Sequence, residues 1–155
     1  MLWHDPSRRH LHTHGLLRPE ALHVLHGSEL IIHAGDVGKS EILERLREIA
    51  PVVAVRGNVD TAPWAEELPE TQVARVVGRN IYVLHDRSQF VADPVTAGYA
   101  AVVFGHSHKV LVETRDGVLY LNPGSAGPRR FRLPITVARL HVSTELVEPE
   151  IVQLA

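Results

Sequence analysis

The sequence predicts an α/β fold in which two mixed β-sheets pack face to face, with helices outside them. Strand-like apolar segments are numerous, whereas two segments show helical spacing. That many strands in one open sheet would leave apolar faces uncovered, and two packed sheets cover each other. The 155 residues contain no internal repeat and no linker, so we expect a single domain over 1–155, with residues 1–13 left unassigned.

The N-terminal part is predicted as a helix followed by a buried strand. Residues 2–11 have no clear period and too many polar groups for a buried strand, so no element is predicted there. Pro19 can begin a helix that Gly27 ends, because proline suits the first turn and glycine suits the residue after the last. Residues 30–32 form a short apolar run, typical of a buried parallel strand.

The next segments continue the alternation of helix and strand. Residues 40–50 carry apolar side chains at helical spacing, with charged side chains on the opposite face, and Pro51 ends this surface helix. Residues 52–55 form a second apolar run. Strand, helix and strand in this order favour parallel pairing with a right-handed crossover.

The second half of the chain is rich in strands. Two hairpins are predicted from paired apolar segments around short polar turns, 73–77 with 81–84 and 110–114 with 118–121. An isolated apolar strand at 101–104 lies between them. The stretches 135–142 and 146–154 finish the chain as a further hairpin.

Composition excludes several classes of protein and site. The formal charge is −2, and the basic pairs Arg8-Arg9 and Arg129-Arg130 are too small for an extended nucleic-acid face. The chain has no cysteine, which excludes disulfides and thiolate metal sites. No apolar run approaches the roughly 18 residues of a membrane-spanning helix, and the N-terminus lacks a signal-peptide core. We therefore expect no membrane partner and a cytoplasmic location.

Polar clusters directly follow four of the apolar strands. They supply an aspartate, an asparagine and three of the 11 histidines: Asp36, Asn58, His85, His106 and His108. Strands that end together place their following loops at one rim of a sheet, where ligands of open α/β folds bind. Carboxylate, amide and imidazole together suit Mn, Fe, Zn, Ni or Co better than an all-oxygen Mg or Ca site.

The order and spacing of five motifs resemble the calcineurin-like metallophosphoesterase superfamily, in its YfcE-like bacterial phosphodiesterase branch. The motifs are Gly35-Asp36, Gly57-Asn58-Val59-Asp60, His85, Gly105-His106-Ser107-His108 and Asn122-Pro123-Gly124-Ser125. The resemblance runs from His14 onward and implies a four-layer α-β-β-α sandwich of the metallo-dependent phosphatase type. It also implies two divalent metal ions, manganese foremost, and a small phosphodiester substrate.

The resemblance further implies a role for each matched residue. Asp36 would bridge the two ions, and the remaining ligands would divide between them, His14 and His108 on the first and Asn58, His85 and His106 on the second. A water between two such ions loses its proton near neutral pH and can attack phosphorus. The catalytic set would be Asp36, Asn58 and His106. Asp60 could orient a ligand histidine from outside, and Asn122 and Ser125 could brace the site.

Two departures from the family pattern affect these expectations. The family begins with Asp-x-His, whereas this chain has His12-Thr13-His14, so His12 would ligate without a negative charge and metal affinity or preference would change. Natural divergence and a gene-model error both explain the unusual residues 1–13. Val59 stands where the protein-phosphatase branch has a histidine that assists the leaving group, which favours a diester over an alkyl monoester.

Other functions remain alternatives at this stage. A binding or scaffold protein with this fold and impaired metal loading, like the retromer subunit that resembles the superfamily, is kept open by His12. A nuclease is disfavoured by the weak positive charge but stays open, since a small nucleotide substrate needs no extended basic face. A homo-oligomer is compatible with the family, although no segment signals an interface.

Several residues outside the motifs have an ordinary structural interpretation. We expect surface or packing roles for the histidines that follow no strand, namely His4, His10, His23, His26 and His141. His33 is expected to pack beneath the site and bond a backbone group. Arg129 and Arg130 could clamp a phosphate, although paired loop arginines are usually solvated. Trp64 could line a substrate pocket or simply pack.

Overall fold

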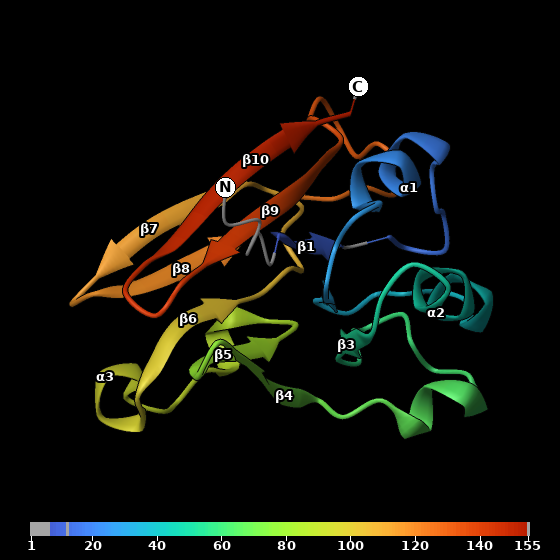
Figure 1. Cartoon of the computed structure of the whole chain (residues 1–155). Coiled ribbons are helices and arrows are strands. Elements are labelled where there is room, and N and C mark those ends of the chain that lie inside the picture. The colour runs from blue at the N-terminus through green and yellow to red at the C-terminus, as the bar shows by residue number, and fades with distance from the viewer. Residues whose placement is uncertain (1–6, 12, 155) are drawn as a thin grey trace.

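The computed structural model describes residues 7–11 and 13–154, and the side chains of 13–154. The strands form two five-stranded sheets (Figure 1). The first sheet has the order β10 (Val147–Gln153), β9 (Thr136–Val142), β1 (Ser7–Leu11), β2 (Ile31–His33) and β3 (Val52–Ala54). The second has the order β4 (Thr71–Val76), β5 (Arg79–Leu84), β6 (Tyr99–Val103), β8 (Val118–Asn122) and β7 (Leu111–Arg115).

The helices are short and lie between the strands in sequence. They are α1 (Pro19–Leu25), α2 (Ser40–Arg47), α3 (Pro94–Ala97) and two 3-10 helices, Pro63–Glu67 and Arg87–Gln89. None of the helices that the structure describes is both long enough and apolar enough to span a bilayer.

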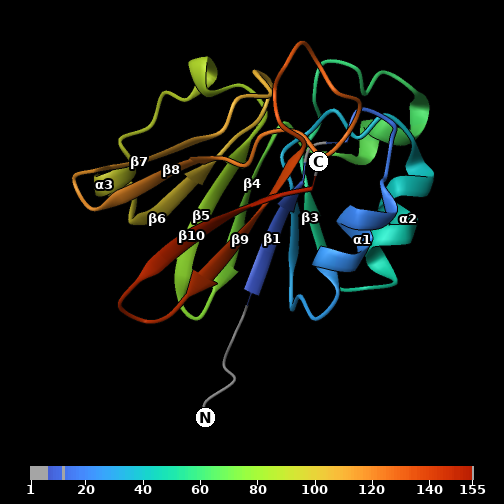
Figure 2. The same cartoon turned by 90° about the horizontal axis from the view of Figure 1, so that it is seen from above.

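The main core lies between the two sheets. Ile32 and Leu140 of the first sheet share one buried cluster with Val83 and Leu121 of the second. The other face of the first sheet is covered by α1 and α2, whose Leu25 and Leu46 are fully buried (Figure 2). The predicted fold class, two mixed sheets with helices outside, is confirmed.

The outer face of the second sheet has a thinner cover. Phe90, in the segment between β5 and β6, packs against Tyr82 with a ring separation of 5.0 Å. Figure 2 shows α3 on this side of the molecule, opposite α1 and α2. The helical layer here is therefore a single short segment, and much of the face is formed by the tyrosines of the sheet itself.

The prediction of no element in residues 2–11 was wrong for residues 7–11. These form β1, a central strand that pairs in parallel with β2, Arg9 opposite Ile31, and antiparallel with β9, Arg9 opposite Arg139. Strand formation depends on pairing partners as well as on side-chain pattern. Two neighbouring strands supply hydrogen-bond partners here, which the local sequence could not reveal.

The parallel strands set the position of the loops that follow them. β1, β2 and β3 pair in parallel in the first sheet, and β5, β6 and β8 pair in parallel in the second. The antiparallel hairpins predicted for β4–β5, β7–β8 and β9–β10 are present. Each sheet therefore has one rim where the carboxyl ends of three parallel strands lie together.

Candidate metal centre

Loops from both sheets meet at the carboxylate of Asp36, which follows β2. Oδ2 of Asp36 lies 2.9 Å from Nε2 of His14, which follows β1, and 3.2 Å from Nε2 of His85, which follows β5. Asp36 and His85 are buried, and the side chain of His14 is 20% exposed. Two imidazole nitrogens from different sheets thus contact one carboxylate oxygen.

The loop after β6 adds two further imidazoles. Nδ1 of His106 lies 3.3 Å from Nε2 of His85, and the ring centroid of His108 lies 4.8 Å from that of His14. His108 is buried and His106 is exposed to solvent. The structure therefore brings together His14, Asp36, His85, His106 and His108. His12 lies outside the described residues.

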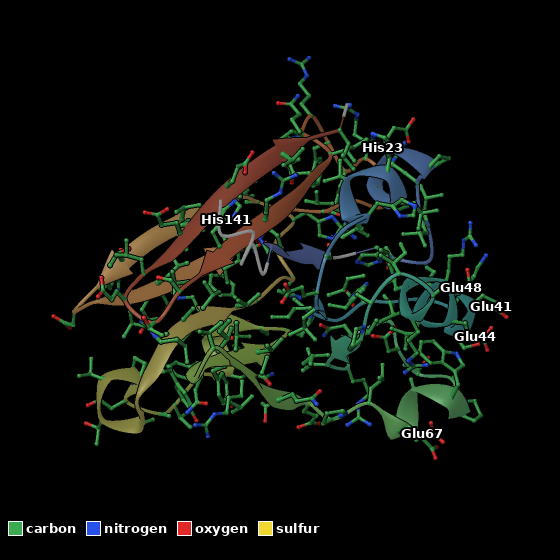
Figure 3. The ribbon with its side chains drawn as sticks, in the orientation of Figure 1. His23, Glu41, Glu44, Glu48, Glu67 and His141 are labelled. Atoms are coloured by element: carbon green, nitrogen blue, oxygen red, sulfur yellow. The ribbon has the colours of Figure 1, made fainter. Side chains whose placement is uncertain are left out.

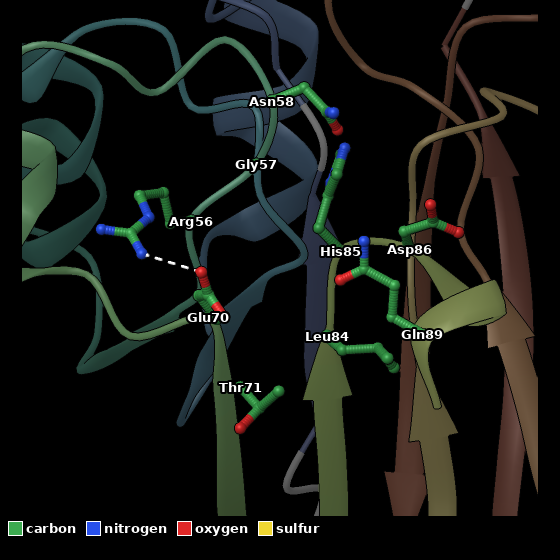
Figure 4. Close-up of a pocket in the computed structure, with 9 residues that line it drawn as sticks. All are labelled: Arg56, Gly57, Asn58, Glu70, Thr71, Leu84, His85, Asp86 and Gln89. Atoms are coloured by element: carbon green, nitrogen blue, oxygen red, sulfur yellow. Dashed lines mark hydrogen bonds and ion pairs between the residues drawn. The ribbon is translucent and has the colours of Figure 1, made fainter. Parts of the chain in front are cut away.

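Asn58 stands at the edge of this group and lines a pocket. Figure 4 shows its amide end and the ring of His85 pointing toward each other. The pocket has a volume of about 280 Å³ and also contains Gln89 and the ion pair of Arg56 with Glu70, 3.1 Å apart. The candidate centre therefore opens into a small polar hollow.

Unusual backbone conformations are concentrated at these loops. Seven non-glycine residues of the described chain have positive φ, and four of them are candidate ligands: His14, Asp36, His106 and His108, with φ of 48°, 56°, 68° and 62°. Left-handed backbone is unfavourable for residues with a Cβ and is found mainly where surrounding structure enforces it, often at functional sites. The fold thus holds these four residues in backbone conformations that are unfavourable for their residue types.

Asp60 ties two of the loops together. Its buried carboxylate accepts backbone N–H groups of Val37 at 3.2 Å, Gly38 at 2.9 Å and Gly57 at 2.9 Å. Asp60 was expected to orient a ligand histidine. It bonds instead to the backbone of two loops, the one that carries Asp36 and its own loop after β3. The sequence showed an aspartate three residues after Gly57, but it did not show which groups that aspartate would bond.

Asn122 fixes the loop that carries the histidines after β6. Its side-chain amide donates to the Gly105 carbonyl at 2.8 Å and to Ser107 Oγ at 3.2 Å, and its Oδ1 accepts the Gly124 N–H at 3.0 Å. Ser125 Oγ accepts the Gly127 N–H at 3.2 Å. Asn122 therefore braces the site, whereas Ser125 orders the loop beyond it.

His33 and Thr13 form a buried network below the centre. The Gly35 N–H donates to His33 Nδ1 at 3.2 Å, and His33 Nε2 lies 2.9 Å from Thr13 Oγ1, which donates to the Val37 carbonyl at 3.0 Å. His33 thus packs and bonds a backbone group. Sequence reasoning missed Thr13, because a threonine beside two histidines carries no signal of burial.

Other candidates lie away from the centre. His141 is 3.4 Å from Glu150 on the exposed side of β9, and His23 is on α1 (Figure 3). Trp64 packs against the cluster under the helices and is absent from the lining of the pocket beside Asn58. His4 and the side chain of His10 lie outside the described residues.

The charge state of His85 depends on its buried neighbours. Burial lowers the pKa of His85, but the hydrogen bond to Asp36, the Ala34 carbonyl and the charges of Asp36 and Asp60 outweigh it and raise the pKa above 6.5. Nδ1 lies 2.8 Å from the Ala34 carbonyl, so this nitrogen donates and Nε2 is directed to Asp36. A backbone carbonyl on the far ring nitrogen is a usual way to orient a metal-binding imidazole.

Pairs of donors around Asp36 and His85 have separations that suit two ligands of one divalent ion. Adjacent ligands of one ion with bonds of about 2.1 Å lie about 3.0–3.4 Å apart at octahedral or tetrahedral angles. The separations of 2.9, 3.2 and 3.3 Å around Asp36 and His85 are close to these values. Among the described His, Cys, Asp and Glu side chains, no group of three or more is arranged so that it could hold a metal ion by itself. Asn58 and His12 are outside that group, so the division of ligands between two ions stays a prediction.

Comparison with known proteins places these features in a family context. Residues 10–145 match the family model described as the calcineurin-like phosphoesterase superfamily domain. A probable metallophosphoesterase of Methanocaldococcus jannaschii is 32% identical over 146 residues, 90% of this chain and 75% of that protein. Phosphodiesterase YfcE of Escherichia coli is 30% identical over 99 residues, 56% of this chain and 50% of YfcE. The structure of Chaetomium thermophilum Vps29 has a TM-score of 0.75 at 18% identity and 96% coverage of both chains, a likeness of fold alone.

Proposed function

Because the chain belongs to the calcineurin-like phosphoesterase superfamily, we propose that it is a metal-dependent phosphodiesterase that hydrolyses a small phosphodiester. The single observation that carries the proposal is the contact of His14 and His85, from different sheets, with one oxygen of Asp36. Such a cluster of imidazole and carboxylate is suited to divalent ions, and two relatives named as a metallophosphoesterase and a phosphodiesterase support the reaction class.

The residues would hold the ions on two sides of Asp36. His14 and His108 would hold the first ion, and Asn58, His85 and His106 the second; His12 is a further candidate on the first. When bound, two divalent ions supply an activated water near neutral pH and positive charge opposite the phosphoryl oxygens. Manganese is the first choice, and Ni, Zn, Fe or Co are alternatives.

The surrounding chain determines how a substrate would be held. Asp36 Oδ1 accepts the Val59 N–H at 3.0 Å, which fixes the carboxylate plane while Oδ2 is directed to the histidines. The pocket beside Asn58 and His85 offers hydrogen-bonding groups from Arg56 and Gln89 for one ester group of the substrate. Its volume of about 280 Å³ is near the lower end of small-molecule sites, which favours a small substrate over a polymer.

The side chain of Val59 favours a diester. It is 44% exposed beside the centre and has no proton to give to a departing alkoxide. A substrate with a good leaving group needs no such assistance, whereas an alkyl monoester gains much from it.

The test is hydrolysis of bis-p-nitrophenyl phosphate by metal-stripped protein, with Mn, Ni, Zn or Mg restored singly. We expect at least one of the four to restore turnover, and Asp36→Asn to abolish it. His23→Gln, which removes an exposed histidine on α1, is the matched control and should retain full activity.

A scaffold function is the second candidate, because the fold is shared with Vps29. Calorimetry separates the two. If no metal restores turnover and none binds with measurable heat, the scaffold function replaces the phosphodiesterase.

A further inference from the structure

The loop between β8 and β9 concentrates positive charge. We call residues 128–133, Pro-Arg-Arg-Phe-Arg-Leu, the basic loop. Arg129, Arg130 and Arg132 are all exposed, and none of them forms an ion pair within the described part of the chain. Three unpaired positive charges within four residues contrast with a net charge of −2 for the whole protein. The loop therefore presents a local attraction for anions.

An aromatic ring stands among these arginines. Phe131 is 88% exposed, and it is the single aromatic among the exposed large apolar side chains of the described residues. Its φ of 54° is unfavourable for a bulky residue. The Leu133 N–H donates to the Arg130 carbonyl at 3.1 Å, which closes the turn around the ring. The loop thus holds an aromatic face in solvent, where burial of the ring would otherwise be favourable.

The base of the basic loop is anchored beside the candidate metal centre. Gly127 packs against the carbonyl of Thr13, the residue before His14, so closely that a Cβ would overlap it. Arg18 donates from Nε and Nη2 to the Gly127 carbonyl, both at 3.3 Å. Gly124 packs against Val110, two residues after His108. The loop therefore leaves the fold next to the chain segments that carry His14 and His108, and Figure 2 shows it, in orange, beyond the carboxyl end of β1.

The basic loop and the pocket flank the centre on different sides. The pocket is lined by Asn58 and His85, whereas the anchor of the loop contacts the chain next to His14 and His108. A diester has two ester groups around one phosphorus, so a substrate held at the centre can place one group in the pocket and the other toward the loop.

We propose that the basic loop binds a nucleotide portion of the substrate, with the base stacked on Phe131 and a second phosphate held by the arginines. This inference rests on the proposed phosphodiesterase function. Base stacking on an aromatic side chain and guanidinium contacts to phosphate are both strong recognition elements, and only a ligand with a planar ring and an additional anion uses both. A single short loop suits one nucleotide rather than an extended strand.

Three substrates with the same leaving group separate the two contacts. They are methyl p-nitrophenyl phosphate, thymidine 5′-(p-nitrophenyl phosphate) and its 3′-phosphorylated form. Phe131→Ala should raise KM by about tenfold for both thymidine substrates and leave methyl p-nitrophenyl phosphate unchanged. The triple change of Arg129, Arg130 and Arg132 to Gln should remove the advantage of the 3′-phosphate, again about tenfold in KM.

The controls are an exposed apolar residue and an exposed arginine that lie outside the basic loop. Leu146→Ala changes a 58% exposed apolar residue, and Arg75→Gln changes an exposed arginine on β4. Both should leave all three KM values unchanged. Equal losses on the three substrates in the loop variants, or no loss on any, would overturn the inference. So would loop variants that keep all KM values but lose sedimentation with phosphatidylserine vesicles, because the loop would then be a membrane contact.

Failure of the proposed function is distinguishable from failure of this inference. If the protein hydrolyses none of the three substrates with any metal, binding of thymidine 3′,5′-bisphosphate is measured by calorimetry. Binding that is lost in Phe131→Ala and in the triple arginine variant supports the basic loop as a nucleotide site. No binding to the unchanged protein overturns it.

Discussion

The carboxylate of Asp60 accepts the backbone N–H of Gly38 at 2.9 Å, although Gly38 follows β2 and Asp60 follows β3. The same carboxylate accepts the Gly57 N–H within its own loop. Asp36, which contacts the site histidines, lies two residues before Gly38 and packs against Gly57. The geometry of the site therefore depends on a residue that contacts none of those histidines through a described hydrogen bond.

Asp60→Ala should destabilise the fold by about 2–4 kcal/mol, because the buried N–H of Val37 and the part-buried N–H groups of Gly38 and Gly57 lose their acceptor. The free energy of unfolding in urea measures this. Asp60→Asn keeps one acceptor oxygen and should lose less. A change within about 0.5 kcal/mol for Asp60→Ala, as at an ordinary surface position, would show that water replaces the carboxylate.

Gly57→Ala should weaken metal binding, because it disturbs the carboxylate of Asp36. A Cβ at residue 57 would overlap the backbone nitrogen and Oδ1 of Asp36, so the carboxylate must move. Calorimetric titration with Mn checks the affinity, for which we expect a loss of at least about tenfold, or about 1.4 kcal/mol. Gly117→Ala is the control. Its Cβ meets open space, so it should cost about 1–2 kcal/mol of stability through its φ of 78° without affecting metal binding.

Asn122→Asp should loosen the loop that carries His106 and His108. The change replaces an N–H donor by an oxygen that faces the Gly105 carbonyl, in a residue that is 1% exposed. We expect a loss of about 1–3 kcal/mol in the free energy of unfolding, together with weaker metal binding. Asn80→Asp, at the start of β5, is the comparison and should be nearly neutral. Equal effects of the two changes would contradict a bracing role for Asn122.

His12→Asp should strengthen metal binding, because it supplies the carboxylate that the family motif has at this position. An added negative ligand should raise the affinity for Mn by about tenfold, which corresponds to about 1.4 kcal/mol. Titration of the metal-stripped protein measures the affinity, and turnover of bis-p-nitrophenyl phosphate gives a second readout. An unchanged affinity would indicate that residue 12 does not ligate an ion.

Much of the arrangement around the site could be predicted from the sequence, because its signals are local. The apolar run at β2 ends at a polar loop, so the position of Asp36 at a rim followed from one segment alone. The amphipathic spacing of residues 40–50 likewise predicted α2, although the helix ends at Arg47. These features require no knowledge of distant partners.

The remainder depends on contacts between distant segments. β1 was missed because its strand pairing is provided by β2 and β9 and is not visible in its own side chains. The partners of Asp60 and the burial of Thr13 were missed for the same reason. The contacts between the imidazoles and the oxygens of Asp36 depend on how the two sheets pack against each other. That packing cannot be predicted from any single segment.

The contacts of His85 with Asp36 and Ala34 bear on how the two sheets are aligned. The interior between the sheets is a layer of apolar side chains, and such packing is not directional, so it holds the layers together without choosing one offset between them. The bonds from His85 to the Ala34 carbonyl and the Asp36 carboxylate are directional and join the second sheet to the first. They therefore help to fix the offset between the two sheets at the rim that carries the site, together with the bond from Arg79 of β5 to the Thr144 carbonyl between β9 and β10.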